Sequence, residues 1–247
     1  MYLKASGKSR FVATLAVFAA LHVILDSIPI YPFREWAVYL EPLEGIVLGP
    51  KLGVLTAIIG GSISRAVVGA NIFSFIYGVT GESIGVATAG LLAKGKWRIV
   101  AVLYAFMLAA YFIHPYGTML PLWTVLDCLV AFALVYPAAV LSKSLLRKEV
   151  DIKRFTLAVL LISFISTVAH SLTMIFILVP AGMYKVEFGT FEAVYYTFVI
   201  GATGSYIEDA MVSAISILVY SPLLLFLRRS KITSFPILGE SLEQSMS

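Results

Sequence analysis

The sequence predicts an all-α integral membrane protein, a polytopic helical bundle of about eight apolar spans, and its composition is the first reason. Of its 247 residues, 60% are hydrophobic and 13% are charged, and the mean hydropathy is +0.95. Soluble domains are only about 45–50% apolar. Apolar runs long enough to cross a hydrocarbon core of about 30 Å recur from Phe11 to Leu227. We therefore expect one transmembrane domain at 1–231, embedded in the lipid bilayer, and a polar, disordered cytoplasmic tail at 232–247.

Eight apolar spans are expected, and residues at their ends help to define the first two. The first, 11–28, follows Lys4, Lys8 and Arg10, and it is longer than the apolar region of about 7–15 residues in a signal peptide. The second ends at Gly49-Pro50, because a residue before proline disfavours the helical conformation. The full expected set is 11–28, 37–49, 52–68, 78–93, 99–114, 122–145, 155–179 and 195–227.

The distribution of Lys and Arg favours eight spans over seven. A seven-span arrangement, with one helix from Leu40 to Ser64, leaves Lys51 inside the lipid and places 12 basic residues on the cytoplasmic side against five outside. Eight spans place 15 of the 18 basic residues on the cytoplasmic side, as the positive-inside rule predicts. We therefore expect a multi-pass protein of the cell membrane, with cytoplasmic N- and C-termini and with Lys51 in a cytoplasmic turn. The three basic residues left outside are Arg34, Arg65 and Lys185.

Ionisable residues inside the spans are the candidate functional residues, since a charge within the membrane normally faces a cavity or a partner. Most fall in the outer half of the membrane or near its middle, among aromatic residues. An outward-open cavity lined by acids, a lone arginine and aromatic faces suits a small heteroaromatic solute, neutral or cationic because the acids outnumber the bases. An interfacial aromatic belt and helix-to-helix hydrogen bonds are the alternative explanations. The predicted substrate-binding residues are Asp26, Trp36, Glu44, Arg65, Asn71, Tyr77, Glu82, Asp127 and His170. Among the acids, Glu82 and Asp127 are the leading candidates for contact with the solute.

Other kinds of site find little support in the sequence. Cys128 is the only cysteine, so we expect no disulfide and no cysteine-based metal site. A metal site of His22, Asp26 and His170 would rest on one i,i+4 pair, and we expect neither a metal nor a cofactor. Nucleotide-binding motifs are missing, and the basic residues lie at span ends rather than in a nucleic-acid patch. Glu208-Asp209 offers only a fragment of a catalytic set, so an intramembrane enzyme is the third hypothesis and we expect a non-enzyme.

Over residues 10–145 the chain resembles the membrane-embedded substrate-binding (S) components of energy-coupling-factor vitamin transporters. The resemblance rests on Ala16-Val17-Phe18-Ala19-Ala20 in the first helix, the polar and aromatic loop after it, the short second helix, and the Gly49-Pro50-x-x-Gly53 turn. It implies that Ala16 and Ala20 dock onto a transmembrane coupling protein that carries two ATPase subunits. It also implies that residues 29–41 cover the substrate. Members of that family typically have six spans, so two of the eight expected here would be additional.

The leading hypothesis is therefore substrate capture. The chain would bind a vitamin-like solute from the outside with high affinity, and its partner subunits would supply the ATP-driven uptake. The alternative is a stand-alone proton-coupled secondary transporter, in which Glu82, Asp127, Glu208 or Asp209 would be protonated in turn.

Overall fold

The computed structural model describes residues 7–31, 34–146 and 150–229, and nearly all of them are helical. The predicted tail at 232–247 lies outside these residues. The first elements are α1 (Gly7–Asp26), β1 (Pro29–Tyr31), β2 (Arg34–Glu35), the 3₁₀ helix η1 (Trp36–Tyr39), α2 (Glu41–Val67), α3 (Ile72–Ala93) and α4 (Trp97–Ile113). They are followed by α5 (Pro115–Met119), η2 (Leu122–Val125), α6 (Leu126–Leu146), α7 (Ile152–Leu178), α8 (Tyr184–Glu187), α9 (Phe191–Ile215), the π-helical turn η3 (Ser216–Tyr220) and α10 (Ser221–Arg229).

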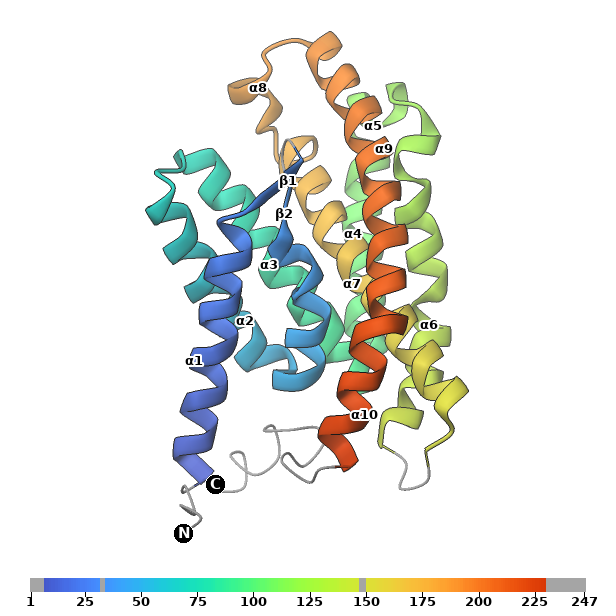
Figure 1. The fold of residues 1–247 in the computed structure, drawn as a ribbon. Helices are drawn as coiled ribbons and strands as arrows, with labels where there is room; N and C mark the ends of the chain where they lie inside the picture. Colours follow the sequence, from blue (N-terminus) through green and yellow to red (C-terminus); the bar gives the residue numbers. More distant parts are fainter. Residues whose placement is uncertain (1–6, 32–33, 147–149, 230–247) are drawn as a thin grey trace.

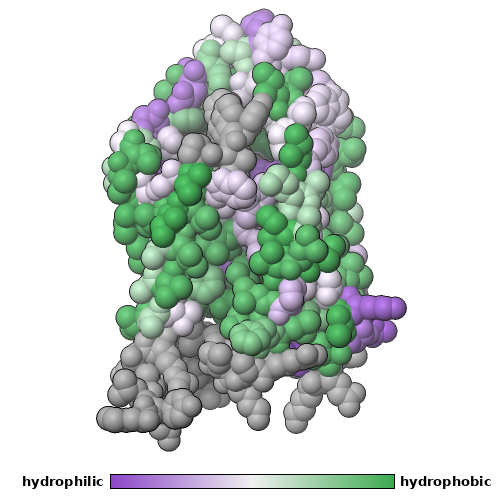
Figure 2. Space-filling model, in the orientation of Figure 1, coloured by the Kyte–Doolittle hydropathy of each residue, from purple (hydrophilic) through white to green (hydrophobic). Residues whose placement is uncertain are grey.

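The described helices confirm a helical membrane bundle but do not support eight spans. Five segments are long and apolar enough to cross a membrane: Glu41–Val67, Ile72–Ala93, Leu122–Leu145, Ile152–Leu178 and Phe191–Arg228. Two shorter helices, Val12–Asp26 and Trp97–Ile113, are also apolar. Hydrophobic residues cover much of the side of the bundle, as a lipid-facing surface requires (Figure 2).

Within α2 the chain reverses direction at Gly49. The backbone there adopts φ +75°, a conformation that glycine tolerates and other residues rarely adopt. A Cβ placed on Gly53 would lie 3.4 Å from the carbonyl oxygen of Glu44. Nine residues of continuous helix would span about 13 Å, so the two parts of α2 fold back on each other. The predicted Gly49-Pro50 turn is therefore present, and the alternative of one continuous helix from Leu40 to Ser64 is wrong.

The reversal explains why the second predicted span is too short to cross a membrane as a helix of its own. Helical residues Glu41–Leu48, before Gly49, rise about 12 Å, less than half of a hydrocarbon core of about 30 Å. This short segment is instead buried in the bundle, where Gly45 packs on α3. A Cβ on Gly45 would lie 2.6 Å from the Cβ of Ala89, so only glycine permits this approach.

Prolines and caps define the other boundaries. Ile28 and Tyr31 each precede a proline and are therefore biased toward extended backbone. A short antiparallel pair of strands, β1 and β2, forms here. The expectation of an all-α chain missed this pair. Asn71 caps α3 by accepting a hydrogen bond from the backbone N–H of Ser74 at 2.7 Å. Asp151 caps α7 in the same way.

Consecutive helices run up and down the bundle (Figure 1). The start of α1, the reversal in α2, the α3–α4 connection and the end of α10 lie at one end, and α8 and the α2–α3 connection lie at the other. Helix α7 is the most central, with residues such as Ile162 and Leu172 fully buried. Tyr104 on α4 donates a hydrogen bond of 2.6 Å to the carbonyl oxygen of Ile165, which fixes α4 against α7.

Candidate functional site

A cavity of about 580 Å³ lies between α3, α6, α7 and α9. This volume is within the range of about 300–1,000 Å³ that small-molecule sites occupy. Its wall includes Val38 and Tyr39 from η1, so the segment predicted to cover the substrate borders the cavity. Helices α7 and α9, which lie beyond the part of the chain that carries the resemblance, contribute a large share of the lining.

Aromatic rings supply flat apolar faces in this wall. Phe73 and Tyr77 are four residues apart on α3, and their rings stack with centroids 5.1 Å apart. Phe198 on α9 stacks on Tyr111 at 6.2 Å. Stacking surfaces of this kind favour a ligand that itself contains an aromatic ring. The aromatic lining residues are Tyr39, Phe73, Tyr77, Phe188 and Phe198.

Carboxylates outnumber basic groups among the described lining residues. The lining contains three acids, Asp127, Glu187 and Glu208, and one base, Arg65. The carboxylate of Asp127 accepts hydrogen bonds from the Ser205 hydroxyl at 2.9 Å and from the backbone N–H of Cys128 at 2.8 Å. The first of these bonds joins α6 to α9, so Asp127 is held at the wall in a fixed orientation.

Arg65 reaches the cavity from a buried polar layer that joins α1, α2 and α3. Its guanidinium donates to Asp26 on α1 at 2.9 Å and to Glu82 on α3. It also donates to the carbonyl oxygens of Gly61 and Ser74, each at 3.2 Å. Two carboxylates and two carbonyls therefore hold the one basic group in the wall, and its positive charge is compensated before any ligand enters.

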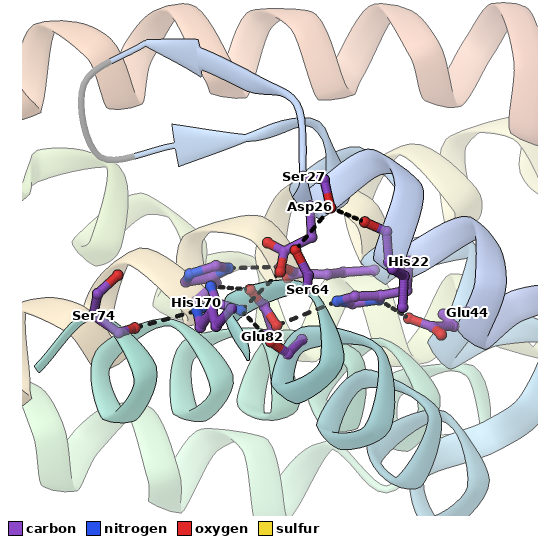
Figure 3. A network of polar contacts seen from close by, with 12 residues as sticks. His22, Asp26, Ser27, Glu44, Ser64, Ser74, Glu82 and His170 are labelled. Carbon is purple, nitrogen blue, oxygen red and sulfur yellow. Dashed lines mark hydrogen bonds and ion pairs between the residues drawn. The ribbon is translucent and has the colours of Figure 1, made fainter. Parts of the chain in front are cut away.

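His22 lies next to this ion pair and is fully buried. Its Nδ1 is 3.0 Å from Glu44 Oε2 and its Nε2 is 3.2 Å from Glu82 Oε2 (Figure 3). A Cβ on Gly60 would lie 2.6 Å from the Cβ of His22, so glycine allows α1 to approach α2 closely enough for these contacts. Ser27, directly after α1, and Ser64 of α2 add a hydroxyl contact of 3.2 Å.

Glycines of α3 provide the space for this polar layer. A Cβ on Gly78 would overlap the Arg65 guanidinium, and one on Gly81 would overlap the ring of His170. Gly85 leaves space for Glu41, whose Oε1 is 2.7 Å from His170 Nδ1. The regularly spaced glycines of α3 therefore allow packing within the chain, because they leave space for polar side chains from neighbouring helices.

The structure separates the nine predicted substrate-binding residues into three groups. Arg65, Asn71, Tyr77 and Asp127 line the cavity. Trp36 is about one-third exposed and packs on Tyr39, with ring centroids 5.6 Å apart. The others lie in the buried polar layer and not at the cavity wall: Asp26, Glu44, Glu82 and His170.

Sequence reasoning missed most of the contribution of α9. Polar and small residues recur there at intervals of three or four, a spacing that places them on one face of a helix. This stripe inside an otherwise apolar span is the signal that would have indicated a cavity-lining helix. Its members are Thr197, Gly201, Ser205 and Glu208, and Met211 continues the same face.

Helix α8 contributes an acid to the cavity wall and carries a lysine close to it. Glu187 of α8 lies in the wall, and Lys185 is two residues before it. Partial burial and the positive charge of Lys185 lower the pKa of His114, so this imidazole is neutral at neutral pH. Its Nδ1 accepts the backbone N–H of Tyr116 at 3.1 Å, as an unprotonated nitrogen must.

Within the described part of the chain, no three His, Cys, Asp or Glu side chains are grouped closely enough to hold a metal ion. No protein-family model, curated protein or solved structure matches the sequence or the fold. The geometry of the cavity and the polar layer is therefore the basis for assigning a function.

We predict that Arg65→Met destabilises the protein by about 3–5 kcal/mol, because it removes the buried guanidinium that Asp26 and Glu82 both contact. Arg154→Met is the matched control, since its ion pair with Asp151 is exposed and is worth about 0–1 kcal/mol. Thermal unfolding in detergent micelles measures both. Equal losses in the two variants would show that the buried ion pair does not stabilise the bundle.

Proposed function

We propose that the chain captures a small heteroaromatic, vitamin-like solute, neutral or cationic, in the cavity between α3, α7 and α9. The observation that supports this function best is the wall itself. It combines stacked rings, hydroxyl groups and a fixed carboxylate around a volume that suits one small molecule. Such a set of groups is suited to binding a solute. The hydroxyl–carboxylate contact described in the wall, between Ser205 and Asp127, joins two helices, and an intramembrane enzyme is the weaker hypothesis.

The charge balance supports a neutral or cationic solute. Arg65 is already engaged by Asp26 and Glu82, and the other ionisable side chains in the described wall are acids. A ligand with two negative charges would be repelled there, whereas a cationic ring would be attracted both to the carboxylates and to the aromatic faces.

We further propose that the chain crosses the cell membrane eight times, with both termini in the cytoplasm. The up-and-down course of the helices supports this topology. In it, the second crossing is made by Glu41–Leu48 together with η1 and the strands before it, and the second part of α2 makes the third. Lys51, Lys94, Lys96 and Arg98 all lie near turns at the end of the bundle where α1 starts, which is the pattern of a cytoplasmic face. The cavity then opens toward the outside.

The outer face of α1 supports docking onto a transmembrane coupling protein. Ala16 and Ala20 are both exposed, one turn apart on the helix, beside exposed Val17 and Leu21. Small side chains on an exposed membrane helix permit the close approach of another helix. The coupling protein and two ATPase subunits would supply ATP hydrolysis, which is the division of labour in the transporters that the N-terminal half resembles.

A stand-alone proton-coupled transporter is the second candidate, and the buried carboxylates and histidines of the polar layer favour it. Purified protein in liposomes separates the two functions. A capture subunit binds solute and moves none under a proton gradient. Solute accumulation by the purified chain alone would contradict capture and establish secondary transport.

We predict that Asp127→Asn weakens solute binding by about 1–3 kcal/mol, because it removes the charge from a hydrogen-bonding group in the wall. Titration calorimetry with the solute that copurifies with the protein, identified by mass spectrometry, measures the loss. Glu192→Gln is the control, since it removes an exposed acid in the first turn of α9 and should bind normally. Unchanged affinity in Asp127→Asn, or a dianionic solute, would refute this assignment.

The topology predicts that a cysteine in place of Lys51, in a Cys128→Ala background, reacts with a membrane-impermeant reagent only from the cytoplasmic side. Lys51 directly follows the Gly49-Pro50 reversal and is exposed. Cysteine in place of Lys185 should show the opposite sidedness. Labelling of position 51 from the outside would rule out the eight-crossing arrangement.

A further inference from the structure

His22 is an imidazole held between two carboxylates. Both ring nitrogens lie within hydrogen-bond distance of a carboxylate oxygen, one from Glu44 and one from Glu82. All three side chains are almost completely removed from solvent, with exposures of 0%, 0% and 2%. The three residues come from three different helices, α1, α2 and α3 (Figure 3).

This geometry requires one more proton than the groups carry in their usual states. A neutral imidazole has one N–H donor and one acceptor nitrogen, and an ionised carboxylate only accepts. With both carboxylates ionised and the imidazole neutral, one of the two contacts would bring two lone pairs together. Both contacts become hydrogen bonds only if the imidazole is doubly protonated or one carboxyl group is protonated.

We propose that His22, Glu44 and Glu82 form a proton-binding site, and that the proton bound there holds α1 against α2 and α3. Within the described residues, Glu44 Oε1 has no hydrogen-bond donor although it is buried. This second observation fits a site in which negative charge is reduced by a proton, because a buried carboxylate oxygen without a donor is costly.

The charges around the site also favour an additional proton. Asp26 on α1, Glu44 on α2 and Glu82 on α3 are three carboxylates, and Arg65 on α2 is the guanidinium among them. The Ser27 and Ser64 hydroxyls face the cluster without charge, and the His170–Glu41 pair lies between α7 and α2. The bound proton removes one unit of negative charge from the His22, Glu44 and Glu82 side chains, which in an apolar interior is a large difference.

The proton at this site affects the packing of α1 in particular, because α1 carries His22. Within Val12–Asp26, His22 and Asp26 are the two ionisable residues, and both are buried against α2 and α3. Loss of the proton at high pH removes one of the two hydrogen bonds that join His22 to Glu44 and Glu82. The site therefore predicts that α1 is held firmly at neutral pH and loosens as the pH rises. This inference is independent of which solute the cavity binds.

The protonation state is measured first, on the full-length protein in micelles. Nitrogen-15 NMR of labelled histidine reports the three imidazoles of the chain, and the His22→Gln variant identifies the signals of His22. We expect a doubly protonated His22 at neutral pH, or a neutral one together with an infrared band of a protonated carboxyl group that Glu44→Gln or Glu82→Gln removes. A neutral imidazole with no protonated carboxyl group would overturn the proposal.

The movement of α1 is measured with spin labels on cysteines at Leu21 of α1 and Ile59 of α2, both exposed, in a Cys128→Ala background. We expect the distance distribution to broaden as the pH rises. Glu44→Gln should abolish this transition, because an amide supplies its own N–H donor. Glu41→Gln, one turn earlier in α2, should retain it. A distance that does not depend on pH, or an unchanged transition in Glu44→Gln, would contradict the role of the proton. If Glu44→Gln does not fold, the NMR measurement on the unmodified protein decides.

Discussion

The contact on which the rest of this structure depends is the buried guanidinium of Arg65 between Asp26 and Glu82. A charge in an apolar bundle is stable only if it is compensated and its hydrogen bonds are complete, and this one is met by carboxylates from two helices besides its own. The pairing of Arg65 with Asp26 and Glu82 therefore determines how α1, α2 and α3 pack. Because Arg65 also lies in the cavity wall, the packing of these helices and the charge of the cavity are set by the same side chain.

The reversal at Gly49 makes that layer possible. It places the short helical segment Glu41–Leu48 beside the second part of α2, so that Glu44 reaches His22 and Glu41 reaches His170. The two glutamates in this apolar stretch are thus the partners of two buried histidines. Glycine is needed both at the reversal, for its positive φ, and along α3, where a side chain would fill the space of the polar groups.

Much of the fold could be predicted from the sequence, because apolar run length and the Gly49-Pro50 signal act locally. The positions of buried charges were also predictable, since an ionisable residue in an apolar span needs a partner. The partner of each buried charge could not be predicted, because the pairing of His22 with Glu44 and Glu82 joins residues far apart in the chain. For the same reason Glu82 was expected at the solute and lies in the polar layer instead. The face of α9 was missed because small residues such as Gly201 carry no charge to mark it.

The most direct test of solute capture is an experimental structure of the protein purified with its own solute. Capture predicts one small molecule in the cavity, with its ring against Phe73 or Tyr77 and a polar atom within hydrogen-bond distance of Asp127, and the Arg65 layer intact beside it. A cavity filled by a lipid chain, or a solute bound elsewhere in the bundle, would contradict it.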